Sequence, residues 1–259
     1  MSAIILDSQV VHYEVLGRGR PVVFLHGWVG SWRYWVPTMQ AVSIGYRAYS
    51  IDLWGFGDSA KASSKYALAQ QVSLVDDFLN EMGIAKVVLI GHGLGAVIAM
   101  LYAQKHTLIV DRLMLIGYPF SPDALDARLQ AETPTALARL LLPQSEADHT
   151  EAAKADHQAV QISLESIAAL DLSALPKQLK TPCLLVHGEN DSLVQVPTMG
   201  INGELPGNLH TLRLEGAGHF PMVDESNKFN RLLADFLALE SGQSPQRLQL
   251  KEEWKRRVR

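Results

Sequence analysis

Short apolar runs alternate with longer segments of helical periodicity along most of this chain. Strands are predicted at VVFLHG (22–27), YRAYSIDL (46–53), VVLIGH (87–92), LMLIGY (113–118), CLLVHG (183–188) and TLRLEG (211–216). Helices are predicted at SLVDDFLNEMG, AVIAMLYAQKH and NKFNRLLADFLALE. Such alternation requires crossover connections, so it predicts an α/β fold whose mostly parallel sheet has helices on both faces. Functional loops should then gather at the carboxyl ends of the strands.

One stretch, residues 121–181, breaks this rhythm. It contains no convincing strand and reads as several helices separated by Pro134 and Pro143. A chain of 259 residues with 47% hydrophobic content can bury one large core. We therefore expect a core made of residues 1–120 and 182–240, a helical cap at 121–181 and a basic tail at 241–259.

Composition limits the partners and the compartment. The formal net charge of -4 gives no reason to expect nucleic acid or an anionic membrane surface as partner. The N-terminus lacks the cationic segment and cleavage site of a signal peptide, so we expect a cytoplasmic protein. The single cysteine, Cys183, lies in a strand-like run and reads as a core residue. His149 and His157 each stand beside an aspartate but have no third convergent ligand, so no metal site is expected.

The segment GHGLGA, residues 91–96, lies where a predicted strand turns into a predicted helix. It fits the G-x-G-x-x-A spacing of a dinucleotide-binding turn. That turn should sit on the first strand of its unit, with an acidic residue at the end of the following strand. Here two strands precede it, and Asp111 comes before the next strand, where a carboxylate would not reach a ribose. Nicotinamide binding is therefore disfavoured, and no cofactor is expected.

The same turn also fits the context of a nucleophile elbow, G-x-S-x-G. Together with FLHGWVGSWRYW, YSIDLWGFGDSAK, LLVHGENDSLVQVP and LEGAGHFPMVDES, the segment LIGHGLGAVIAM resembles the α/β-hydrolase family over about residues 10–240. The resemblance implies esterase-like or lipase-like serine hydrolase chemistry. It implies that Asp191 is the triad acid and His219 the catalytic base, in the chain order that the family uses.

The departure from the family lies at Gly93, where the resemblance expects the nucleophilic serine. Glycine has no atom that can attack a carbonyl, but it tolerates the strained backbone of the elbow, so its presence should stabilise the fold by about 1 kcal/mol. No other G-x-S-x-G occurs in the chain. Ser31 and Ser59 lie on loops at the same edge but have no base nearby in sequence.

The resemblance also implies an oxyanion hole and a pocket. The hole would use the backbone N–H groups of Trp28 and Leu94, which do not depend on the missing hydroxyl. The pocket should be apolar or aromatic and should take a small apolar or aromatic acyl substrate. His26 is expected to brace the oxyanion loop and His92 to pack against nearby loops. The residues expected around the pocket are His26, His92, Trp54, Tyr118, Phe120 and Phe220.

Three functions remain open at this point. The chain is a serine-hydrolase type whose covalent chemistry is lost or severely impaired at Gly93. Alternatively, His219 oriented by Asp191 acts as a general base without a covalent step. As a third possibility, the pocket binds a ligand without turnover. The sequence sets neither the substrate nor the oligomeric state.

Overall fold

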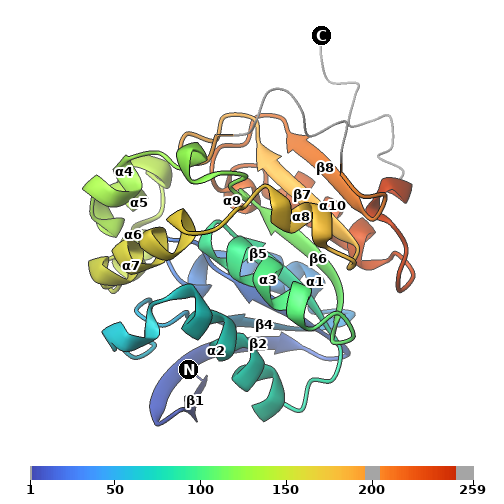
Figure 1. Ribbon diagram of the computed structural model, residues 1–259, viewed down its shortest axis with the longest axis horizontal. Coiled ribbons are helices and arrows are strands. Elements are labelled where there is room, and N and C mark those ends of the chain that lie inside the picture. Colours follow the sequence, from blue (N-terminus) through green and yellow to red (C-terminus); the bar gives the residue numbers. More distant parts are fainter. Residues whose placement is uncertain (1, 196–204, 249–259) are drawn as a thin grey trace.

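The computed structural model describes residues 2–195 and 205–248, and these form an eight-stranded sheet in the order β1-β2-β4-β3-β5-β6-β7-β8 (Figure 1). The neighbours from β4 to β8 pair in parallel, as the sequence predicts. These six strands are β3 (Arg20–Leu25), β4 (Tyr46–Ile51), β5 (Val87–His92), β6 (Val110–Ile116), β7 (Cys183–Gly188) and β8 (Leu209–Leu214). Every residue of β5 and β7 is buried, which explains why these strands read as continuous apolar runs.

The first two strands were not predicted. β1 (Ser2–Leu6) and β2 (Gln9–Gly17) form an antiparallel hairpin, and β2 also pairs antiparallel with β4. Their turn consists of Asp7 and Ser8, both at positive φ, in place of the Asn-Gly or Asp-Gly pair that usually marks a hairpin. Ile5 in β1 is 73% exposed, so the apolar residues of this edge strand do not alternate with polar ones and give no period-two sequence signal.

Helices cover both faces of the sheet. Figure 1 shows α2 and α3 in front of it, and α1 packs against α10 on the other face. α3 is buried almost all round because the sheet, α2 and α8 enclose it, which agrees with its nearly uniform apolar sequence. The helices of the core are η1 (Trp32–Trp35), α1 (Val36–Val42), η2 (Ser63–Lys65), α2 (Leu68–Glu81), α3 (Leu94–Lys105), α9 (Pro221–Asp224) and α10 (Ser226–Leu237).

Residues 121–181 form a helical insertion between β6 and β7, and α4 to α7 stand apart from the sheet in Figure 1. Within the described residues it makes one β contact, an isolated antiparallel bridge between Leu125 and Val194. α8 returns to the core, where Gln104 Nε2 donates to the carbonyl of Leu175. The insertion comprises η3 (Pro122–Ala124), α4 (Arg128–Ala131), α5 (Pro134–Leu141), α6 (Glu146–Ala152), α7 (His157–Ala168) and α8 (Ala174–Gln178).

The segment after α10 is attached to the edge of the sheet as far as it is described. Ser244 Oγ donates to the carbonyl of Gly207, Gln246 Nε2 donates to the carbonyl of Leu209, and a short helix, η4 (Pro245–Arg247), follows Ser244. The basic end of the predicted tail, residues 249–259, lies outside the described residues. Among the helices of the described ranges, none has the length and apolar character needed to span a bilayer.

Candidate functional site

The turn between β5 and α3 contains three glycines with different structural requirements. A Cβ on Gly91 would lie 2.3 Å from the carbonyl oxygen of Gly95, and one on Gly95 would lie 2.4 Å from that of Leu25. Both positions therefore need glycine because another stretch of backbone approaches too closely. Gly93 differs, because its φ is 51° and its ψ is −111°, and a Cβ there would meet a side chain, the ring of Trp28, at 3.1 Å. The geometry thus allows a side chain at position 93 only with strain and a small shift of Trp28.

His219 and Asp191 form a buried pair although 28 positions separate them in the chain. His219 Nδ1 lies 3.0 Å from both carboxylate oxygens of Asp191. The N–H groups of Leu193 and Val194 donate to Oδ1 of the same carboxylate at 2.9 and 3.0 Å. The loop after β7 therefore fixes the carboxylate, and the carboxylate fixes the imidazole.

This arrangement also keeps Asp191 ionised and orients the imidazole of His219. Burial by itself would raise the pKa of Asp191, but the charge of His219 and the hydrogen bonds from His219, Val194 and Leu193 outweigh burial and lower it to about 2. An ionised Asp191 keeps the proton of His219 on Nδ1. Nε2 then carries the lone pair, and it has no hydrogen-bond partner among the described residues. His219 is only 3% exposed. The pair can act as a general base on an atom placed beside Nε2.

His219 packs directly beside the turn between β5 and α3. Its ring centroid lies 4.5 Å from that of His92, the residue preceding Gly93, and its backbone carbonyl accepts from His92 Nε2 at 2.8 Å. His92 Nδ1 in turn lies 2.9 Å from the hydroxyl of Tyr34, which accepts from the N–H of Gly27 at 2.7 Å. Both ring nitrogens of His92 are therefore engaged. Burial lowers the pKa of His92 well below its usual range, and the charge of His219 lowers it further.

His26 ties two loops of this edge together. Its Nδ1 donates to the carbonyl of Gly27 at 2.8 Å, and its Nε2 accepts from the N–H of Leu53 at 3.0 Å. The ring is fully buried, and burial lowers its pKa. Because both nitrogens of His26 and both of His92 are bonded to protein groups, neither ring has a nitrogen free for a ligand. This geometry fits the bracing role expected for His26.

Two backbone N–H groups beside Gly93 stay unused. Those of Trp28 and Leu94 donate to no acceptor within the described residues, whereas the N–H of Gly93 donates to Ile116 and that of Gly95 to His26. Leu94 is the first residue of α3, so its N–H lies at the positive end of the helix dipole. Two free N–H donors, a base and a turn without a side chain thus lie at one edge of the sheet.

Comparison with known proteins settles the family. A family model described as the alpha/beta hydrolase family matches residues 22–232. This chain belongs to the α/β hydrolase family. A putative carbamate hydrolase, RutD, of Yersinia enterocolitica is 27% identical over 90% of this chain and 94% of that protein. A pimeloyl-(acyl-carrier protein) methyl ester esterase of Aliivibrio fischeri is 26% identical over 88% and 97% of the two chains.

Solved structures confirm the α/β-hydrolase fold. An esterase from Exiguobacterium antarcticum superposes with a TM-score of 0.81 at 22% identity and covers 92% of this chain and 99% of its own. The N-acyl homoserine lactonase AidH, crystallised as a serine-to-glycine mutant with N-hexanoyl homoserine lactone, superposes with a TM-score of 0.82 at 20% identity. The match covers 91% of this chain and 96% of AidH.

The aromatic residues predicted around the pocket of this α/β hydrolase are all at least partly buried. Phe220 packs against Tyr34 at 5.3 Å and His92 at 5.0 Å between ring centroids. Tyr118 donates its hydroxyl to the carbonyl of Leu172, and burial raises its pKa. Phe120 packs edge-on against the Tyr118 ring at 5.4 Å. Trp54 is buried. Of the four, Phe220 packs directly on His219, at 5.1 Å between ring centroids.

Several residues that organise this α/β hydrolase site were not predicted. Tyr34 bridges two loops, as described above. The buried carboxylate of Asp52 accepts from the N–H groups of Trp32 and Asp58 and from His12 Nδ1, so it fixes the loops after β3 and β4. Asp52 and Tyr34 both lie in segments that carry the family resemblance, but no spacing marked their partners.

The helical insertion also contacts both loops through polar groups. Glu151 in α6 accepts from Ser31 Oγ at 2.9 Å and from Lys154 Nζ at 2.8 Å, and Lys154 also contacts Asp58 at 2.9 Å. In α7, Ser163 Oγ accepts from the indole N–H of Trp28 at 3.0 Å. Ser31 is therefore engaged with the insertion. Similarly, the hydroxyl of Ser59 donates to the carbonyl of Asp52.

Possible metal ligands come together at one place within the described residues. Atoms of His12, Asp52 and Asp58 lie within 4.8 Å of one another. His12 and Asp52 are already hydrogen-bonded to each other at 2.8 Å, and Lys154 neutralises Asp58, so the group reads as a structural network. His149 donates through Nε2 to the carbonyl of Leu142 at 2.8 Å and is separate from this group.

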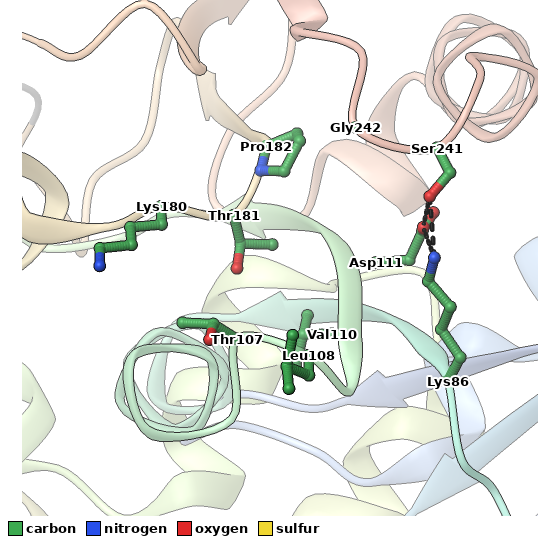
Figure 2. Close-up of a pocket in the computed structure, with 10 residues that line it drawn as sticks. All are labelled: Lys86, Thr107, Leu108, Val110, Asp111, Lys180, Thr181, Pro182, Ser241 and Gly242. Atoms are coloured by element: carbon green, nitrogen blue, oxygen red, sulfur yellow. Dashed lines mark hydrogen bonds and ion pairs between the residues drawn. The ribbon is translucent and has the colours of Figure 1, made fainter.

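A surface pocket of about 260 Å³ lies at the opposite edge of the sheet, at the amino ends of the strands (Figure 2). In Figure 2, Lys86 and Ser241 both point to the carboxylate of Asp111, while Lys180 points away. Lys86 Nζ lies 3.0 Å from Asp111 Oδ1. Lys86 and Asp111 are therefore paired with each other, and this pocket takes no part in the site around His219.

Proposed function

We propose that this α/β hydrolase binds a small ester or related acyl substrate beside His219, and that it forms no acyl-enzyme because Gly93 occupies the nucleophile position. One observation carries the proposal. A hydrogen-bonded His219–Asp191 pair lies against a strand-to-helix turn that keeps the positive φ of an elbow but offers no side chain. The relatives support the substrate class, since they are named as a carbamate hydrolase and a methyl ester esterase.

The free N–H groups of Trp28 and Leu94 serve as the oxyanion hole. In related sites, removing one donor of this kind lowers kcat by about 10² to 10³. These groups polarise the substrate carbonyl whether or not a nucleophile is present. An AidH variant with glycine in place of a serine was crystallised with a lactone, which suits the idea that a serine-to-glycine site still binds an acyl ligand. Residues 121–181 serve as the cap, because α6 and α7 contact the loops that carry these donors.

A second candidate function, hydrolysis by a water molecule that His219 activates, is favoured by the intact His219–Asp191 pair. A water molecule beside Nε2 of His219 gives its proton to that nitrogen while its oxygen bonds to the carbonyl carbon. The resulting oxyanion rests on the N–H groups of Trp28 and Leu94. When the intermediate collapses, the bond to the leaving alkoxide breaks and His219 returns the proton to it. This route needs no side chain at position 93.

The test compares the parent with Gly93→Ser and, as a matched control, Gly93→Ala. We expect Gly93→Ser alone to hydrolyse short aryl esters and to be labelled at residue 93 by an organophosphonate, as read by peptide mass spectrometry. The alanine variant carries the same Cβ without a hydroxyl, so it separates nucleophilicity from any rearrangement of the turn.

Two other results point elsewhere. Ester hydrolysis by the parent that disappears in His219→Ala establishes the water route. In the other result, Gly93→Ser folds but neither hydrolyses esters nor is labelled, and an ester or lactone raises the Tm of the parent. That result indicates a protein that binds a ligand without hydrolysing it.

A further inference from the structure

Trp28 takes part in the site in three ways. Its ring covers Gly93, its backbone N–H is free beside that residue, and its indole N–H donates to Ser163 Oγ in α7 at 3.0 Å. This hydrogen bond joins residues 135 positions apart, and both side chains are completely buried. A buried indole N–H that lost its acceptor would be left unsatisfied, so the bond strongly constrains the ring.

Ser163 itself is held in one orientation. Its hydroxyl donates to the carbonyl of Val160 one turn earlier at 2.7 Å, which directs the oxygen lone pairs toward Trp28. A serine hydroxyl has a single proton, so it acts here only as acceptor for the indole. α7 is a 12-residue helix capped at its start by Asp156, whose own N–H donates to the carbonyl of Gly55. The acceptor is thus mounted on a rigid element.

We propose that Ser163 is a positioning residue: through its hydrogen bond to Trp28, α7 fixes both the backbone N–H of the oxyanion loop and the ring that covers position 93. The cap and the oxyanion hole then act as one unit. The catalytic consequence rests on the proposed function, whereas the position of Trp28 does not.

The chain supplies a matched control in the same helix. Ser166 Oγ also donates to a backbone carbonyl one turn earlier, that of Ile162 at 2.8 Å, but it accepts no bond from any loop of residues 2–195 and 205–248. Ser163→Ala and Ser166→Ala therefore remove the same kind of intrahelical bond, and only the first releases Trp28. Ser163→Thr keeps a hydroxyl and tests rescue.

Crystal structures of the parent and these three variants measure the positioning directly. We expect the Trp28 ring to leave the face of Gly93, and its N–H to move, in Ser163→Ala only. An unmoved Trp28 in Ser163→Ala overturns the proposal, as does an equal shift in Ser166→Ala. If Ser163→Ala does not fold, the same comparison is made with Trp28→Phe, which keeps a ring but lacks the indole N–H.

Kinetics in the Gly93→Ser background test the consequence for catalysis. We expect Ser163→Ala to lower kcat about tenfold with KM unchanged. When the donor is displaced, the charged transition state loses more stabilisation than the neutral bound ester does. Ser163→Thr should restore the rate, and Ser166→Ala should leave it unchanged. A moved Trp28 with an unchanged kcat overturns the catalytic role. If Gly93→Ser is itself inactive, the proposed function fails, and the crystal structures still decide whether Ser163 positions Trp28.

Discussion

Adding a Cβ at position 93 should destabilise the protein by an amount that the structure allows us to estimate. Positive-φ backbone strain contributes about 1–3 kcal/mol for a residue other than glycine. The 3.1 Å approach to Trp28 adds about 1 kcal/mol, because the ring must shift although Ser163 holds it. Reduced freedom of the unfolded chain offsets about 0.4–1 kcal/mol. We therefore expect Gly93→Ser and Gly93→Ala each to lose about 2 kcal/mol, which for a chain of this size lowers the Tm by about 4–8 °C.

Thermal unfolding of both variants and of Gly83→Ala measures these contributions separately. Gly83 also has a positive φ, 64°, but nothing lies within 4 Å of a Cβ built there. Gly83→Ala thus reports backbone strain alone and should lose about 1 kcal/mol. Equal Tm losses at positions 83 and 93 would show that Trp28 offers no resistance. A Gly93→Ala variant as stable as the parent would refute the strained-elbow reasoning altogether.

Other substitutions test the remaining interactions. Asp191→Asn removes a carboxylate whose folded pKa of about 2 lies below its unfolded value. That carboxylate therefore stabilises the parent by about 2 kcal/mol at pH 7, and this contribution is lost as the pH falls from about 4 to 2. In urea unfolding across this pH range, the free energies of unfolding of the two proteins should converge. Tyr34→Phe leaves the N–H of Gly27 and Nδ1 of His92 unpaired, and we expect about 2 kcal/mol less stability, with an unchanged urea midpoint as the contradicting result. Glu151→Gln weakens the contacts of α6 and should speed amide exchange in α6 and α7 but not in β5; a uniform increase would contradict this.

The parallel part of the sheet could be predicted because its strands are buried on both faces. Such strands read as uninterrupted apolar runs, and β5 and β7 match the predicted ranges at both ends. The pairing of His219 with Asp191 followed from motif resemblance, since nothing in their 28-residue separation indicates contact. The hairpin of β1 and β2 escaped prediction because its turn and its exposed Ile5 carry weak local signals.

The contacts between the insertion and the loops could not be predicted, for a physical reason. Glu151 lies in the polar run EADHTEA, which reads as a solvated helix, yet it is 3% exposed. Its buried carboxylate accepts a hydrogen bond from Ser31, which is 120 positions away, and the buried Ser163 accepts one from Trp28. Such partners are set by how separate elements dock, and neither periodicity nor composition encodes that docking.

Gly91 and Gly95 are required by nearby backbone, whereas Gly93 is not, and this difference has an evolutionary consequence. A Cβ on Gly91 or Gly95 would lie 2.3 or 2.4 Å from a backbone oxygen, so both positions require glycine whatever residue stands between them. Serine and glycine codons of the AGC and GGC type differ by one base. Under the proposed function, a lineage carrying this turn can therefore lose or regain the nucleophile by a single mutation while the rest of the turn is inherited unchanged.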